Sequence, residues 1–197
     1  MKTLFSFTLF ATFAVAVSLH AADGPWENSP DGSLGRITEY RGVNDTPIAA
    51  YLRKPKGDGP FAAVVLIHGG GESKEGTYAL GRMNSAPTAN FVAEGWAVFS
   101  IDFRPNSPFK PIEWDDACRA VEALRAMPFI DGKRIAMMGG SHGGYNTARA
   151  AARCDLACAV PCAPAAIDLD EVAKAKAAGF KLSPNLERVL ANPPTSD

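Results

Sequence analysis

The chain has 197 residues, of which 47% are hydrophobic and 21% are charged, enough for one domain with a buried core. Twenty basic and 21 acidic residues leave a formal net charge of −1 at pH 7. A nucleic-acid partner or an anionic membrane surface calls for an excess of Lys and Arg, so this balance argues against both.

The first 22 residues have the pattern of a secretory signal peptide. Lys2 is the only early charge, Leu4 to Leu19 is apolar apart from small hydroxyl residues, and two alanines precede Asp23. The alternative is an uncleaved membrane anchor, but the apolar run is shorter than the ~20 residues that a spanning helix needs. We therefore expect export to the periplasm or beyond, with no membrane contact once the signal is cleaved.

After this signal, the sequence predicts a short connection and one domain. Residues 23–33 are rich in Gly, Pro, Asn and Ser, which is typical of a linker or surface arm. In the remainder, residues 34–197, two alternating runs at Arg36–Arg41 and Ile48–Leu52 flank a turn at Gly42–Asp45. This pattern predicts an antiparallel hairpin.

Apolar runs then alternate with helical patterns. Strands are predicted at Val64–Ile67, Trp96–Ile101, Arg134–Met138 and Leu156–Pro161. Helices are predicted at Ala89–Glu94, from Ile112 to the residue before Pro128, and from Gly143 to Arg153. A last helix is predicted to begin at the acidic segment 168–171 and to end at Ala178. Such alternation predicts an α/β fold with a mostly parallel sheet and right-handed crossovers. No strand is predicted from Leu182 to Asp197.

The most informative motif joins the strand at Arg134–Met138 to the helix that follows. Gly139, Ser141 and Gly143 form G-x-S-x-G in a strand–turn–helix context, which a nucleophile elbow requires. Glycines on either side allow a sharp turn that projects the serine hydroxyl clear of the sheet. We expect Ser141 to be a nucleophile.

A second motif follows the strand at Val64–Ile67. It reads His68-Gly69-Gly70-Gly71, and its glycines leave main-chain amides free to bind the oxygen of a tetrahedral intermediate. We name residues 68–71 the His-Gly turn. The expected oxyanion donors are the amides of Gly70, Gly71 and His142.

With both motifs in this order, the chain resembles the α/β-hydrolase superfamily. The Gly139–Gly144 segment is similar to the prolyl-oligopeptidase-like (peptidase S9) and dienelactone-hydrolase-like branch, and the resemblance runs from about Ile37 to about Leu169. It implies a serine hydrolase acting on an ester or a peptide without a cofactor. Dienelactone-type members usually carry Cys where Ser141 stands, and prolyl peptidases add a propeller for which this chain has no room.

The sequence departs from that family after the elbow. A triad acid and then a His are expected downstream, yet the only histidines are His20, His68 and His142. Asp168 or Asp170 is a possible relocated acid, with a helix cap as the alternative. We expect either an α/β-hydrolase domain that lacks its last strands and is poorly active, or a non-catalytic binding scaffold of the same fold.

Two histidines and one loop have alternative interpretations. His68 is either a base or a structural residue beneath its loop, and the second is favoured because its neighbouring glycines bind the oxyanion. The His142 ring is not expected to meet the Ser141 hydroxyl, because adjacent residues on the turn point in different directions. Four polar residues of the loop after the His-Gly turn are either substrate contacts or part of a solvated surface: Lys74, Tyr78, Arg82 and Asn84. Arg104 either binds a substrate carboxylate or braces a loop, and the second is favoured.

The four cysteines are Cys118, Cys154, Cys158 and Cys162. Export permits disulfides, four cysteines allow three full pairings, and the sequence does not select one. The favoured interpretation is four small buried apolar residues. A metal site is not expected, because no suitable His lies nearby.

Overall fold

The computed structural model describes residues 23–70, 85–104, 109–165, 169–182 and 184–191. Several predicted features lie outside these ranges: the signal peptide at 1–22 with His20, Gly71, the loop residues Lys74, Tyr78, Arg82 and Asn84, and Asp168. Asp170 lies in a described helix, but its side chain is not among the described parts of the structure.

The described strands form one seven-stranded sheet in the order β1-β2-β3-β5-β4-β6-β7. Their bounds are β1 Glu27–Asn28, β2 Leu34–Arg41, β3 Pro47–Lys54, β4 Phe61–Ile67, β5 Ala97–Ile101, β6 Ile130–Ser141 and β7 Cys158–Pro164. β5, β4, β6 and β7 run parallel, while β1, β2 and β3 pair antiparallel and join the parallel part where β3 meets β5. The predicted hairpin and parallel sheet are confirmed.

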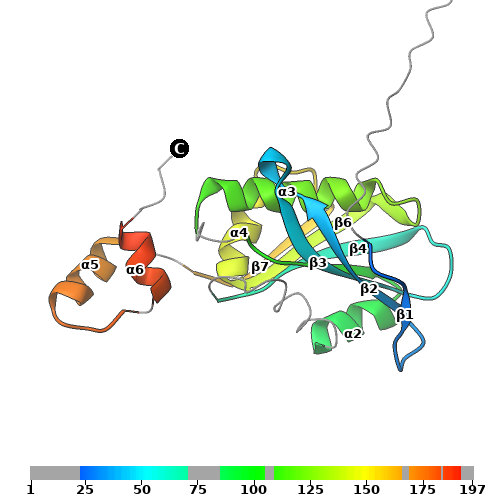
Figure 1. Cartoon of the computed structure of the whole chain (residues 1–197), viewed down its shortest axis with the longest axis horizontal. Coiled ribbons are helices and arrows are strands. Elements are labelled where there is room, and N and C mark those ends of the chain that lie inside the picture. The colour runs from blue at the N-terminus through cyan, green and yellow to red at the C-terminus, as the bar shows by residue number, and fades with distance from the viewer. Residues whose placement is uncertain (1–22, 71–84, 105–108, 166–168, 183, 192–197) are drawn as a thin grey trace, which may run out of the picture.

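Helices cover both faces of the sheet (Figure 1). The described helices are η1 Val43–Asp45, α2 Ala86–Ala93, α3 Pro111–Arg125, α4 His142–Ala150, α5 Leu169–Ala177 and α6 Pro184–Ala191. Of these, α5 and α6 lie together to one side of the sheet and cover neither face (Figure 1). α3 and α4 lie on one face and α2 on the other (Figure 1). The helix α6 was not predicted, because its eight residues begin with a proline and lie in a stretch of polar composition.

The core on the α3 and α4 face follows from the amphipathic pattern of α3. Apolar residues at helical spacing, Trp114, Ala117, Val121 and Leu124, are at most 2% exposed, while Arg119 on the opposite side is exposed. Ala117, Val121 and Leu124 pack on alternate residues of the central strands, which bury their remaining side chains on the α2 face. This two-faced burial explains why the central strands are almost wholly apolar.

The segment predicted as a linker lies along the sheet edge. β1 pairs with β2, Thr38 donates to Asp23 Oδ1 at 2.6 Å, and the Trp26 ring meets Phe129 edge-on at 6.0 Å. Residues 23–33 are therefore an arm packed on the sheet. Among the described residues, no helix is long and apolar enough to cross a bilayer.

The interpretation of the cysteines as four small buried residues is wrong. Cys118 on α3 and Cys154 after α4 form a disulfide with a Cα–Cα distance of 5.4 Å. Cys158 is exposed and Cys162 half-buried, both as free thiols in β7. The sequence could not select this pairing, because it depends on how α3 lies against the end of α4.

Candidate active site

Ser141 stands at the junction of β6 and α4. Its backbone has φ 53° and ψ −117°, a conformation that a residue with a side chain adopts only when its surroundings impose it. The residue is exposed, at the C-terminal end of a central parallel strand. This is the strained, accessible position that the elbow motif predicts.

The glycines around Ser141 are required by close packing. A Cβ placed on Gly143 would lie 2.2 Å from the Ile67 carbonyl oxygen, and one on Gly139 would lie 2.4 Å from the Gly143 carbonyl oxygen. Both separations are far below van der Waals contact. The start of α4 therefore sits directly against the end of β4, which brings Ser141 to the loop that follows β4.

The His-Gly turn reaches the elbow from that loop. A Cβ placed on Gly69 would lie 3.3 Å from the Ser141 Cβ and 2.9 Å from the Gly140 carbonyl oxygen. Gly70 has φ +91°, a value suited to glycine, and the space around it is open. The structure thus brings Gly69 to Ser141 and the Gly70 carbonyl oxygen to the ring of the next residue, His142, while Gly71 is outside the described residues.

The His142 ring locks the two turns together. Its Nδ1 lies 2.9 Å from the Gly70 carbonyl oxygen, and since a carbonyl only accepts, Nδ1 donates. Its Nε2 lies 2.8 Å from Glu113 Oε2. The ring is stacked between Phe103 and Phe109, with centroids at 4.4 and 3.9 Å. As expected, this ring is not placed as a base for Ser141.

The backbone of His142 opens the helix α4, whereas its ring is stacked between Phe103 and Phe109. As the first residue of α4, His142 has a backbone N–H with no partner inside the helix. It lies at the positive end of the helix dipole, one residue from the Ser141 hydroxyl.

His68 is a structural residue beneath its own turn. It is 2% exposed, with Nε2 at 2.9 Å from Asp102 Oδ1 and Nδ1 at 3.0 Å from the Gly69 carbonyl oxygen. Both ring nitrogens are engaged, so the ring holds the His-Gly turn from below. The favoured interpretation of His68 is confirmed.

Sequence reasoning missed the acid that anchors His142. Glu113 is 4% exposed, and its Oε2 also accepts from the Phe109 N–H and the Asn146 side-chain amide, both at 3.1 Å. One signal was available: Glu113 and Asp116 fall on the inward face of α3, beside Trp114 and Ala117. Acids at core-facing helix positions are rarely buried without partners.

Arg104 braces the hairpin against α3. Its guanidinium donates to both carboxylate oxygens of Asp116 and, at 3.0 Å, to the Val43 carbonyl oxygen. The hydrogen bond and charge of Asp116 raise the pKa of Arg104 above its usual range. The interpretation of Arg104 as a brace is confirmed.

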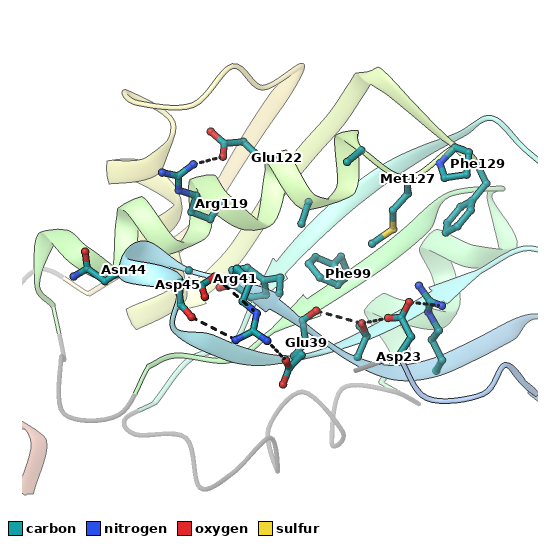
Figure 2. Close-up of a pocket in the computed structure, with 17 residues that line it drawn as sticks. Asp23, Glu39, Arg41, Asn44, Asp45, Phe99, Arg119, Glu122, Met127 and Phe129 are labelled. Carbon is teal, nitrogen blue, oxygen red and sulfur yellow. Dashed lines mark hydrogen bonds and ion pairs between the residues drawn. The ribbon is translucent and has the colours of Figure 1, made fainter. Parts of the chain in front are cut away.

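One hollow lies beside the elbow, and a larger groove lies away from it. One of about 170 Å³ adjoins the elbow and is lined by Leu66, Ile67, His68, Pro87, Met138, Gly139, Gly140 and Cys162. A larger groove of about 540 Å³ lies between β2 and α3, away from the elbow glycines. Figure 2 shows that its rim charges pair with one another, Arg119 with Glu122 and Arg41 with Glu39. Only the smaller hollow adjoins the proposed nucleophile.

The comparisons with known proteins agree with this geometry. The BD-FAE family model matches residues 50–156, which include both turns and the strands that carry them. The chain belongs to the BD-FAE family. It is also 32% identical over 111 residues to esterase FrsA of Escherichia coli O157:H7, an alignment covering 53% of this chain and 25% of that protein.

Solved structures share the fold of the BD-FAE chain. Acetyl xylan esterase from Paenibacillus sp. R4 superposes with a TM-score of 0.62 at 21% identity, covering 86% of this chain and 60% of that one. Acetyl xylan esterase 1 from Thermoanaerobacterium sp. JW/SL YS485 gives 0.62 at 17% identity, with 88% and 61% covered. Dipeptidyl peptidase 4 of Porphyromonas gingivalis gives 0.52 at 20% identity, with 61% and 19% covered. The alignments thus span about a quarter of the curated esterase and about 60% of the acetyl xylan esterases.

Proposed function

We propose that the BD-FAE domain hydrolyses esters through an acyl-enzyme on Ser141. The observation that carries this proposal is the meeting of the two turns: an exposed serine at positive φ, with the backbone of Gly69 beside it and the Gly70 carbonyl oxygen bonded to the His142 ring. A serine with a purely structural role requires neither that strain nor that close approach of a second turn.

In the proposed reaction, the Ser141 Oγ attacks the ester carbonyl carbon and gives its proton to a base. The oxyanion is bound by the amides of His142 and of Gly70 or Gly71. The intermediate collapses, the alcohol leaves with the proton, and water then releases the acid by the same steps. Loss of one oxyanion donor costs about 3 kcal/mol in comparable enzymes.

The relatives favour an ester over a peptide as substrate. The curated relative is named an esterase, and two of the structural neighbours are named acetyl xylan esterases. We propose a small acyl ester, with an acylated carbohydrate as the substrate class to be tested first. Because a dipeptidyl peptidase shares the fold, a peptide amide is the competing substrate.

The base is proposed to come from outside this sequence. Of its three histidines, His68 and His142 have both ring nitrogens engaged, and His20 lies before the described residues. Loss of a triad member lowers the rate by about 10⁴ to 10⁶. The same observation favours the second candidate, a binding scaffold in which Ser141 never reacts, so the two must be separated by experiment.

A chemical-rescue assay distinguishes the serine hydrolase from the binding scaffold. Hydrolysis of p-nitrophenyl acetate by the chain is measured with increasing imidazole, which can stand in for the absent base, and Ser141→Ala at the same imidazole concentrations is the control. A serine hydrolase lacking its base predicts a rate that rises above that of the control. Equal rates for the two proteins at every concentration contradict the nucleophile assignment and favour the scaffold.

We also propose that the protein is exported and cleaved near Asp23. The Cys118–Cys154 disulfide supports an oxidising compartment, because such bonds are rare in reducing cytosol. The expected result is a periplasmic or secreted protein whose N-terminal sequence begins close to residue 23. Recovery of the uncleaved chain from the cytoplasm contradicts export.

A further inference from the structure

A small hollow lies beneath the two turns, between the hairpin, α3 and α4. It leaves about 10 Å³ for the centre of a water molecule, which is roughly the room that one water needs. Its walls come from β2, β4, the end of β5, α3 and α4: Tyr40, Ile67, Ile101, Asp102, Phe103, Arg104, Glu113, Asp116, Ala117 and Asn146.

Two polar atoms on residues of these walls have no hydrogen-bond partner among the described residues, Tyr40 Oη and Asn146 Oδ1. Tyr40 is 3% exposed and Asn146 is 1% exposed, so bulk water does not satisfy either. A buried polar atom left unpaired is costly, and native proteins generally supply a partner or an ordered water.

The two atoms have complementary hydrogen-bonding characters. Burial, with the negative charge of Asp116 as the next cause, raises the pKa of Tyr40 well above its usual range. The hydroxyl therefore keeps its proton and is a donor, whereas an amide oxygen such as Asn146 Oδ1 can only accept. A single water molecule accepts from the first and donates to the second, and its other hydrogen is left for a carboxylate of the wall.

We propose that this hollow is a binding site for one structural water molecule, which joins Tyr40 on β2 to Asn146 on α4. Asn146 in turn donates to Glu113, the carboxylate that holds the His142 ring. The water thus connects the hairpin to the helix that begins at the elbow, and it supports the elbow from below. The proposal does not depend on catalysis by Ser141.

The first test is a crystal structure of the chain at a resolution that resolves ordered solvent. The expected result is one density peak in the hollow, about 2.7–3.0 Å from both Tyr40 Oη and Asn146 Oδ1. An empty hollow with both side chains well ordered, or a direct contact between the two side chains, overturns the proposal.

The second test compares two hydroxyl deletions by thermal unfolding. Tyr40→Phe removes the water's donor, and we expect the melting temperature to fall by about 2–4 °C. Ser100→Ala is the control: Ser100 Oγ is also buried without a partner among the described residues, but Ser100 is not a residue of this hollow. Its melting temperature is expected to stay or rise. A rise for Tyr40→Phe as well overturns the proposal.

Discussion

The strand β6, which ends at the elbow, and the neighbouring strand β7 both contain an apolar run, but the two runs have opposite surroundings. Met137 on β6 is fully buried, whereas Val160, which stands on β7 beside Met138, is 42% exposed. On the α4 side of the elbow a Cβ on Gly143 has no room, while on the β7 side one on Gly140 finds only the Cys162 carbonyl oxygen, at 4.0 Å.

This difference shows how the site is supported. The described residues enclose Ser141 tightly from below and from the His-Gly turn, through buried histidine–carboxylate pairs and close backbone contacts. Towards β7 the contacts are main-chain ones, since Ser141 pairs with Pro164 and its carbonyl oxygen accepts from the Ala165 N–H at 3.0 Å, while the side chains of β7 are mostly exposed. The following predictions test whether the contrast is energetic as well as geometric.

The largest effect is expected from the disulfide on the enclosed side. Replacing Cys118 and Cys154 with Ser is predicted to lower the free energy of unfolding by about 4 kcal/mol, from the 36-residue separation that the bond closes. Chemical denaturation measures this. Cys158→Ser on exposed β7 is the matched control and should leave stability within about 0.5 kcal/mol. A comparable loss from both variants contradicts the contrast.

Truncating side chains on the two strands should give the next largest difference. Met137→Ala opens a cavity in a core where this side chain is fully buried, and it is predicted to cost about 3 kcal/mol. Val160→Ala should cost less than about 0.5 kcal/mol, because water already reaches that side chain. If denaturant titration finds Val160→Ala as costly as Met137→Ala, then β7 is covered in solution.

Adding one methyl group tests the elbow itself. Gly143→Ala would force a Cβ into the Ile67 and His68 carbonyl oxygens, and we predict a loss of about 2 kcal/mol together with a displaced α4. Gly140→Ala has room and should be neutral or slightly stabilising. Thermal unfolding of both variants decides: a Gly143→Ala protein as stable as Gly140→Ala means that the two turns are not in contact.

The smallest expected effect has the opposite sign. Ser141→Gly relieves the positive φ and is predicted to raise the free energy of unfolding by about 1 kcal/mol while removing all imidazole-dependent esterase activity. The measurements are denaturant unfolding and the rescue assay. A destabilised Ser141→Gly protein would show that the serine side chain stabilises the fold and that its backbone is not strained.

Much of this architecture could be predicted from the sequence because it follows from local patterns. The elbow, the His-Gly turn, the hairpin and the inward face of α3 depend on glycines at fixed spacing or on hydrophobic periodicity. The strand limits differed: β6 runs from Ile130 to Ser141, beyond both ends of the predicted Arg134–Met138, and β7 begins at Cys158 and not at Leu156.

What could not be predicted depends on contacts between distant segments. The pairing of Cys118 with Cys154 and the position of Glu113 under His142 each need the packing of α3 on α4. Similarly, Asp102 meets His68 only because β4 and β5 are neighbours in the sheet. A sequence pattern predicts that a residue faces inward, but not which residue it meets.

The central claim is that Ser141 reacts within a cluster of main-chain donors from two turns. The most direct measurement is a crystal structure of the chain after reaction with a fluorophosphonate in the presence of imidazole. The account predicts a phosphonyl group on Ser141 Oγ, with its oxygen about 2.7–3.1 Å from the His142 amide and from an amide of the His-Gly turn. Modification of another residue, or an adduct on Ser141 whose oxygen meets none of these amides, would contradict it.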